Sequence, residues 1–465
     1  MATPSQQVLK FLPVQGHTVR ADFEGGALSS DFGPILLRGI DKHTQLSHAI
    51  AVAIHDTRHQ SYVDHTMEDL IAQRVYQIAC SYEDANDANT LRRDPMFKLA
   101  LERRPLDEDN DLASAATFSR LENGVTRTDL YRIAKAFVDR FIASYSAPPQ
   151  IIVLDMDHSV DPTHGQQELA LFNAHYDTHC YLPLFVFEGL SGKLVTAVLR
   201  PGKRPTGEEN AMIIKRIVRS LRQHWPDTHI VLRGDSHFAN PQLMQIALDD
   251  PACDFVFGLS SNRTLAPLAE PLLAQAKQLH ETSCCNAQRF GETPPHSTRL
   301  YEAFDYAAGS WPHVFRVILK AEVMGLGANP RFVVTSLTEP TPEILYEQLY
   351  CARGQDENFI KHIKNDLASD RTSDHTFQAN QMRLFFACAA YNLHLSVRCE
   401  LLQGTELAHA QPSTVIIKLF KLAVRVVQYQ DRITLHLPSS CSVKSILVKI
   451  TEILYRIPIP QYNTA

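Results

Sequence analysis

Five residues between positions 350 and 364 carry reactive or charged groups at helical spacing: Tyr350, Arg353, Glu357, Lys361 and Lys364. At about 100° per residue, their side chains fall within one narrow arc of a helix. That face presents a phenol, a guanidinium, a carboxylate and two ammonium groups. The combination is poor for a core. It suits a metal ion beside a phosphodiester, because the carboxylate binds the cation and the cationic groups bind phosphate.

The opposite face of the same segment is apolar. Phe359, Ile363 and Leu367 recur at i, i+4 and i+8, which is the pattern of a buried helix face. Thr341 and Pro342 are a suitable N-cap and first-turn proline, so we expect the helix to begin there. The helix then has one side for packing and one for chemistry, and a metal site needs further carboxylates from elsewhere in the chain.

Two apolar segments that end in acid can supply those carboxylates. Residues 151–157 read as a buried strand that carries Asp155 and Asp157, and residues 229–235 read as another that ends in Asp235. Residues two apart on a strand point to the same face of a sheet. Since neighbouring strands can bring their carboxyl ends close together, we expect these acids to approach one another.

Together with Glu357, these acids form a candidate metal-binding set. Three carboxylates supply hard oxygen ligands and enough negative charge for two Mg²⁺ or Mn²⁺ ions. Two such ions about 3.5–4 Å apart can activate a water or hydroxyl and stabilise the leaving oxygen of an in-line phosphoryl transfer. Each acid alone is more often a turn cap or a surface pair. The joint arrangement is what indicates a site.

The elements that must hold these residues predict a mixed α/β sheet. Residues 151–259 read as three strands in a meander, followed by helix, strand, helix and strand, and residues 331–337 read as a further buried strand. Residues 265–330 break this rhythm, and we interpret them as a mainly β insertion. A hairpin that turns at Gly25-Gly26 and the helices after it predict an N-terminal hairpin-and-helix region. The expected divisions are 1–145, 146–264, 265–330, 331–400 and a helix-hairpin-helix segment at 401–465.

Composition excludes few classes of protein. The net charge of −6 is unlike a dedicated DNA coat protein, but local basic clusters such as Lys215, Arg216 and Arg219 can still hold phosphates. The nine cysteines show no metal-type CxxC spacing, and no apolar run reaches the length of a membrane span. Residues 1–10 lack a secretory signal. We therefore expect a folded cytoplasmic protein with reduced thiols.

Four ordered motifs resemble a known family. The spacing Tyr350-x2-Arg353-x3-Glu357-x6-Lys364 is similar to the Y-x2-R-x3-E-x6-K signature of insertion-sequence DDE transposases. Three further segments resemble the insertion sequence 1380 family, over residues 1–455: TFSRLEN (117–123), LDMDHS with DPTHGQQ (154–159 and 161–167), and LRGDSHF (232–238).

The resemblance assigns roles by motif. Asp235 matches the second catalytic Asp, and Glu357 matches the catalytic Glu. Related transposases show Asp-x-Thr at the first position, which Asp157-x-Ser159 matches with the loss of one methyl group, and Asp155 is the alternative on the same strand face.

Accessory roles follow in the same way. Tyr350, Arg353 and Lys364 match positions that would bind phosphates of a DNA end. Lys361 is not part of the motif, and we include it only because its side chain lies on the same helix face.

The resemblance implies a ribonuclease-H-like core with a β-rich insertion between the second Asp and the Glu. It implies a bacterial enzyme that binds terminal inverted repeats as a homodimer or higher oligomer and acts in the cytoplasm, on the nucleoid when bound to DNA. Two Mg²⁺ or Mn²⁺ ions per active site would support strand cleavage and transfer of the 3′-hydroxyl into target DNA. Residues 1–145 are the expected region for repeat recognition.

Three alternatives remain open from the residues alone. One is a ribonuclease-H-like nuclease that only hydrolyses, and another is a catalytically inactive DNA-binding regulator. A metalloenzyme that acts on a substrate other than nucleic acid is the third.

Overall fold

The computed structural model of the chain describes residues 8–311, 313–325 and 327–459. The chain forms two compact units. The first comprises Met1–Gly124 and Ala389–Ala465, and the second comprises Val125–Cys388. Every residue singled out above for chemistry lies in the second unit. No helix of the described residues is both long enough and apolar enough to cross a membrane.

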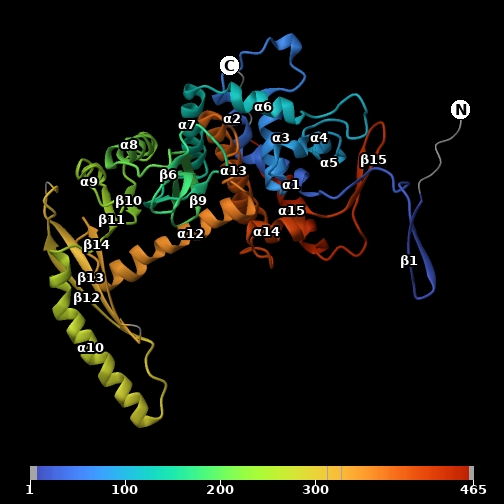
Figure 1. Cartoon of the computed structure of the whole chain (residues 1–465). Coiled ribbons are helices and arrows are strands. Elements are labelled where there is room, and N and C mark those ends of the chain that lie inside the picture. Colours follow the sequence, from blue (N-terminus) through green and yellow to red (C-terminus); the bar gives the residue numbers. More distant parts are fainter. Residues whose placement is uncertain (1–7, 312, 326, 460–465) are drawn as a thin grey trace, which may run out of the picture. The chain divides into compact units, whose positions relative to one another are not determined.

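The second unit contains an eight-stranded mixed sheet, in the order β12-β13-β14-β11-β10-β4-β8-β9 (Figure 1). Strand β10 pairs in parallel with β4 and β11, and the remaining pairs are antiparallel. The expected mixed α/β class is confirmed. The strands of the second unit are β4 (Ile151–His158), β5 (Asp161–Pro162), β6 (Leu171–Asn173), β7 (Thr178–Tyr181), β8 (Leu184–Glu188), β9 (Lys193–Val198), β10 (His229–Gly234), β11 (Cys253–Leu259), β12 (Ser297–Tyr306), β13 (Phe315–Met324) and β14 (Gly327–Thr335).

Helices cover both faces of this sheet. Their bounds are α7 (Arg127–Ala143), α8 (Gly207–His224), α9 (Pro241–Leu248), α10 (Leu265–Phe290), α11 (Pro342–Ile344), η3 (Leu345–Tyr350), η4 (Cys351–Arg353), α12 (Gly354–Lys361), η5 (His362–Asp366) and α13 (Phe377–Ser396), which runs on into the first unit. Ile152 and Leu154 of β4 pack in one core cluster with residues of α7, α8 and α9. Val153, which points the other way, packs in a second cluster with Leu345 and Tyr346 of η3. Because side chains alternate along β4, Asp155 and Asp157 lie on the same face of the sheet as Val153, which is the face covered by η3.

Local sequence explains where several helices begin. Thr206 caps α8, and Glu209 completes a capping box, as expected from the sequence. Thr126 and Asp129 form the same motif at the start of α7. Thr341 accepts a hydrogen bond from the Ile344 N–H at its side chain. This confirms the predicted start of the helix that carries Tyr350 to Lys364, which we call the signature helix (Pro342–Asp366).

The segment 265–330 is only partly the β insertion that we expected. It opens with the 26-residue helix α10, which continues through the polar stretch after Thr282 and ends where Gly291 takes a left-handed conformation (φ 70°). Strands β12, β13 and β14 then extend the central sheet, because β14 pairs with β11. Helix α10 lies along β12 and β13 (Figure 1). The polar residues were misleading because one face of this helix is exposed and needs no apolar pattern.

The expected boundary at residue 145 lies instead at Gly124. Helix α7 belongs to the sheet unit because its apolar stripe packs there: Phe137 stacks on Phe385 of α13, with ring centroids 5.6 Å apart, and Phe141 contacts Trp225 after α8. The C-terminal segment 389–465 groups with the N-terminal residues. Strand β15 there pairs with β3 near the chain start, a long-range contact that spacing along the chain does not predict.

The first unit is mainly helical. Its elements are β1 (Leu9–Val14), β2 (His17–Ala21), β3 (Leu28–Ser29), α1 (Gly33–Thr44), α2 (Leu46–Ala53), η1 (Gln60–Tyr62), α3 (Met67–Ala79), η2 (Ala85–Asp87), α4 (Ala88–Leu91), α5 (Pro95–Ala100), α6 (Ala115–Gly124), η6 (Val397–Leu401), α14 (Pro412–Val415), η7 (Ile416–Phe420), β15 (Val424–Gln428), β16 (Ile433–His436) and α15 (Lys444–Arg456). The predicted hairpin at Gly25-Gly26 is wrong. The turn lies at Gln15-Gly16, where both residues have positive φ (49° and 82°), as a two-residue hairpin loop with type I′ twist requires.

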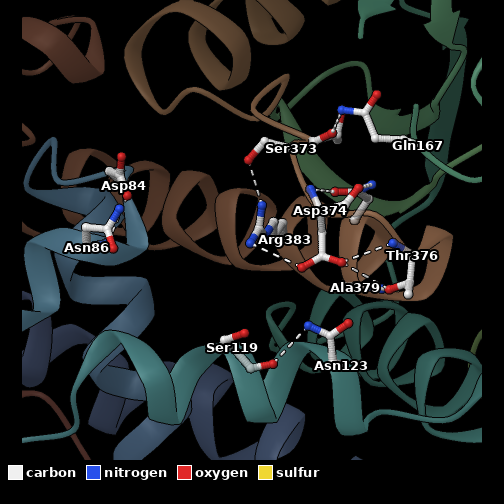
Figure 2. Close-up of polar contacts among 12 residues, drawn as sticks. Asp84, Asn86, Ser119, Asn123, Gln167, Ser373, Asp374, Thr376, Ala379 and Arg383 are labelled. Carbon is white, nitrogen blue, oxygen red and sulfur yellow. Dashed lines mark hydrogen bonds and ion pairs between the residues drawn. The ribbon is translucent and has the colours of Figure 1, made fainter. Parts of the chain in front are cut away.

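The chain after the signature helix is held at the start of α13 (Figure 2). Asp374 accepts a hydrogen bond from the Thr376 N–H at 3.0 Å and lies 3.5 Å from Arg383, which also donates to Ser373. Gln167 donates to the Thr372 carbonyl at 3.2 Å. These contacts tie the turn after the helix to the segment between β5 and β6.

Candidate active site

The two strand-end acids lie at the same edge of the central sheet. Asp157 is the penultimate residue of β4, and Asp235 directly follows Gly234, the last residue of β10. These strands pair in parallel, with Gly234 opposite Met156, so Asp235 follows opposite Asp157. The approach of the two strand ends that the sequence predicted is confirmed.

Glu357 comes to these acids from helix α12. Burial raises the pKa of Asp157 from its ordinary 3.8 to about 7; the Arg353 guanidinium opposes this shift, and the negative charges of Asp235 and Glu357 add to it. The three carboxylates therefore share one electrostatic neighbourhood. Asp157 has a side chain only 18% exposed, whereas Glu357 is exposed. A proton or a cation must lower the repulsion among these three groups.

The donor chemistry of this set fits a hard divalent cation, because all three side chains offer carboxylate oxygens. Across the described ranges, no three His, Cys, Asp or Glu side chains already form a closed ligand group. Asp157 instead has Arg353 as its counter-charge, with Nη1 3.5 Å from Oδ2. Glu357, exposed on its helix, can change rotamer at little cost. Asp157, Asp235 and Glu357 are the residues that would hold the ion.

Tyr350 and Arg353 stand directly beside the acids. The pKa of Tyr350 is raised by burial, with Arg353 opposing the shift and Asp235 adding to it. A Cβ built at Gly258 would meet the Tyr350 hydroxyl at 2.5 Å and the Ser236 nitrogen at 3.1 Å. Glycine on β11 thus makes room for the phenol next to the turn that carries Asp235. Sequence analysis missed Gly258, since a glycine inside a strand pattern is only a weak signal.

The two lysines of the charged helix face, Lys361 and Lys364, have different surroundings. Lys364 is turned inward: its Nζ donates to the Val160 carbonyl at 2.5 Å and to Ser159 Oγ at 3.2 Å, and it lies 3.4 Å from the fully buried Asp161. Lys361 is exposed and makes no ion pair within the part of the chain that the structure describes. Lys364 therefore holds the turn after β4, while Lys361 is available to a ligand.

Lys364→Met is expected to destabilise the protein by about 3 kcal/mol, because it leaves the buried Asp161 carboxyl without its cation. Urea unfolding gives the measurement, and Asp161→Asn should restore most of the loss. Lys361→Met is the matched control. It should leave the unfolding free energy unchanged but weaken DNA binding, and the slope of log affinity against log salt concentration should fall in magnitude by about one. Equal stability of the two single variants would contradict the inward role of Lys364.

Comparison with known proteins decides the family. The family described as "Transposase DDE domain group 1" matches residues 11–459, nearly the whole chain. The chain belongs to this DDE transposase family. It is therefore a DNA transposase, a phosphoryl-transfer enzyme of a family that generally uses divalent metal ions.

Among solved structures, the chain is similar to a piggyBac transposase in a cryo-EM structure of its synaptic complex with hairpin DNA, with 12% identity, a TM-score of 0.43, and coverage of 92% of this chain and 83% of that chain. The comparison with curated proteins gave no match.

The signature helix of this transposase is not a single regular α-helix. Residues 345–350 and 362–366 form wide π-helical turns, 351–353 form a tight 3₁₀ turn, and only 354–361 are α-helical. The buried side of the helix accordingly includes Ile360 as well as the predicted Ile363 and Leu367, and Phe359 is half-buried against Phe187, with ring centroids 5.4 Å apart. Irregular turns of this kind are common at functional sites.

Asp155, the alternative first acid of this transposase, is occupied by a different partner. It is fully buried, and both of its oxygens accept from Arg233, with Nε–Oδ1 and Nη2–Oδ2 distances of 2.5 Å each. A carboxylate in a bidentate pair has few lone pairs left for a metal ion. The geometry thus favours Asp157 over Asp155 as the first ligand.

Asp356, directly before Glu357, is a buried acid that sequence analysis missed. Burial and then the charge of Asp155 raise the pKa of Asp356 to about 10, so its carboxyl group is neutral at pH 7. No N–H or O–H of the described residues donates to it. Beside a Glu on a polar helix, no sequence signal distinguishes this Asp from a surface residue.

The histidines near the motifs do not form part of the acid set. His158 stacks on Phe238, with ring centroids 5.1 Å apart, and burial lowers the pKa of His158 to about 4, so its ring is neutral. The His237 ring atom Nδ1 lies 3.8 Å from Asp235 Oδ2, and the His237 backbone N–H donates to Asp235 Oδ1 at 2.9 Å. This hydrogen bond orients the Asp235 side chain in the turn after β10.

Proposed function

We propose that this transposase uses a single site, formed by Asp157, Asp235 and Glu357, to cleave DNA at terminal inverted repeats and to join the released 3′-hydroxyl to target DNA. The observation that carries the proposal is the buried Asp157 carboxyl, on which Arg353, Asp235 and Glu357 all act electrostatically. We further assign the chain to the insertion sequence 1380 family and its sheet to the ribonuclease-H-like fold.

Two Mg²⁺ or Mn²⁺ ions bound by these acids would activate the attacking water or hydroxyl and stabilise the leaving oxygen. The chain's own residues do the rest. Asp157 would hold an ion as a carboxylate, with the cation in place of the proton that burial favours. Arg353 lies 3.5 Å from Asp157, and its guanidinium could bind a phosphate beside the acids in bidentate fashion.

Further contacts to DNA come from the same helix. Tyr350 can donate its hydroxyl to a phosphate oxygen beside Asp235, and Lys361 adds an exposed point charge. Lys364 acts in this scheme by holding the turn after β4 and keeping Asp157 in place, and its role as a phosphate ligand would require it to leave Asp161.

The partners of the proposed reaction are double-stranded DNA with terminal inverted repeats and a target DNA, bound by a homodimer or higher oligomer. The first compact unit, which contains most of the region 1–145, is the proposed repeat-recognition part. Both steps are transfers of a phosphodiester between oxygen atoms, so strands are joined without ATP.

Incubation of the purified protein with end-bearing DNA and a supercoiled target plasmid tests this function. With Mg²⁺ or Mn²⁺, we expect strand cleavage at the repeat end and covalent joining of that end to the plasmid. EDTA should abolish both products. A substrate with scrambled ends is the matched control and should be neither cut nor joined.

Two other outcomes would replace the proposal. Cleavage without joining, across several metal and target conditions, would assign a nuclease that only hydrolyses. Binding of repeat ends without cleavage in any divalent cation would assign a DNA-binding regulator.

A further inference from the structure

A buried ionic cluster lies beneath the candidate active site. Its centre is Arg233 of β10, which is 2% exposed, and its first partner is the fully buried Asp155 of β4. The two residues are register partners in the parallel pair of strands. The guanidinium donates a hydrogen bond to each carboxylate oxygen at 2.5 Å, so β4 and β10 are joined by side chains as well as by their backbones.

The same arginine also contacts the signature helix. Its third nitrogen, Nη1, donates to the Leu349 carbonyl in η3 at 2.5 Å, one residue before Tyr350. The carboxyl of Asp356 on α12 is fully buried and interacts electrostatically with Asp155 and Arg233. We call Arg233, Asp155, Asp356 and the Leu349 carbonyl the buried clamp. It connects β4, β10 and the signature helix, which are the three elements that carry the proposed metal ligands.

The buried clamp is tightly enclosed by the turn after β8. A Cβ built at Gly189 would overlap Asp155 Oδ2 and would lie 2.6 Å from Arg233 Nη2. The Gly189 N–H donates to the Val153 carbonyl at 2.8 Å, which holds this backbone in place over the ion pair. Only glycine allows the approach, so the clamp has little freedom to shift.

Each side chain of the clamp lies one or two residues from a proposed ligand, in the pairs Asp155–Asp157, Arg233–Asp235 and Asp356–Glu357. Asp155 and Asp157 lie on one strand and share a face, whereas Asp235 follows the end of β10 and Glu357 is next to Asp356 on α12. In each pair, a fixed clamp residue therefore restrains the backbone that carries the ligand. The ligands carry like charges and repel one another before a cation binds. A rigid connection below them is needed to keep their spacing.

We propose that the buried clamp, with Arg233 at its centre, is a positioning device that sets the spacing of Asp157, Asp235 and Glu357 for divalent cations. This inference rests on the proposed function. Arg233 suits the role because its planar fork makes three directed hydrogen bonds at once, which a lysine cannot do. Metal sites need their ligands held to within about 0.5 Å, and contacts behind the ligands supply that precision.

Arg233→Lys tests the proposal, because it keeps the charge and removes the fork. Mn²⁺ binding is measured by electron paramagnetic resonance without DNA, and cleavage and repeat-end affinity are measured separately. We expect Mn²⁺ affinity to fall about tenfold or more. Cleavage should slow about 100-fold, as for a misplacement of about 1 Å, while the Kd for repeat-end DNA stays within about twofold of wild type because no clamp residue is exposed.

Arg222→Lys is the matched control. Arg222 on α8 also donates to a carboxylate (Asp250, 2.6 Å) and to four carbonyls, which belong to Trp225, Pro226, Thr228 and Ala252. None of its partners lies within two residues of a proposed ligand. Its substitution should lower stability but leave Mn²⁺ affinity and cleavage rate unchanged.

Arg233→Lys with wild-type Mn²⁺ affinity and rate, or with losses equal to those of Arg222→Lys, would overturn the inference. If Arg233→Lys does not fold, Asp356→Ala replaces it, since this change removes the helix-side carboxyl of the clamp and keeps both members of the Arg233–Asp155 pair. Wild-type Mn²⁺ affinity in a folded Asp356→Ala protein overturns the inference as well. Absence of Mn²⁺ binding by the wild-type protein overturns the proposed function, and the inference with it.

Discussion

Asp235→Asn is expected to lower both DNA cleavage and strand transfer by on the order of 10³-fold or more, because it removes one anionic ligand from the proposed metal site. Asparagine can still accept the hydrogen bond from the His237 N–H at its side-chain oxygen, so the turn after β10 should keep its shape. The affinity for repeat-end DNA should therefore remain close to wild type. Gel-based cleavage and joining assays with Mg²⁺ and Mn²⁺ give the measurement.

Asp249→Asn is the matched control for this change. Asp249 is an exposed aspartate at the end of α9 in the same unit, and its side chain accepts from Gln245 at 2.7 Å. Its substitution should leave cleavage unchanged. Metal-dependent cleavage that persists in Asp235→Asn at the wild-type rate would show that the proposed ligand set is incorrect.

Asp157→Asn is expected to stabilise the metal-free protein at pH 8 while abolishing its activity. The folded chain raises the pKa of Asp157 from 3.8 to about 7. A carboxyl group with a raised pKa favours folding at low pH, and this contribution is lost as the pH rises from about 4 to about 7. The wild-type protein must therefore hold an unfavourable buried charge at pH 8, which asparagine removes.

The expected gain for Asp157→Asn at pH 8 is about 2–4 kcal/mol of unfolding free energy, and it should vanish near pH 4. Urea unfolding in EDTA across pH 4.5–8 measures it. Added Mg²⁺ should stabilise the wild-type protein and have little effect on the variant, because the cation replaces the proton on Asp157. A stability difference that does not change with pH would contradict the buried, charge-coupled state of this carboxyl.

Both expected effects arise from one property of the site. Three acids brought together on rigid elements store electrostatic repulsion that a cation relieves. Active sites commonly sacrifice stability in this way, since the geometry that serves chemistry is not the geometry of lowest free energy for the empty protein.

The elements that carry the candidate acids could be predicted because their signals are local. The strands that hold Asp157 and precede Asp235 are short apolar runs, and the helix with Glu357 begins at a Thr-Pro pair, so hydrophobic periodicity and helix capping were sufficient to locate them. The predicted hairpin at Gly25-Gly26 is wrong because the strands turn earlier, at Gln15-Gly16, which has the backbone angles that a two-residue loop needs.

The insertion was harder to predict from local pattern. Helix α10 is exposed along much of its length, so its polar second half looked like a connecting stretch, and it became recognisable only where it packs on β12 and β13. The assignment of α7 to the sheet unit likewise depends on contacts with α13 and with Trp225.

Residue types and periodicity along the chain were enough to predict the α/β class, the candidate acids Asp157 (or Asp155), Asp235 and Glu357, and the cationic helix face that accompanies them. Partner choice was settled only in three dimensions. Arg233 pairs with Asp155, 78 residues away, and Lys364 binds Ser159, 205 residues away. Which acid is neutralised and which lysine turns inward depends on burial and on such distant contacts, and neither follows from spacing along a single strand or helix.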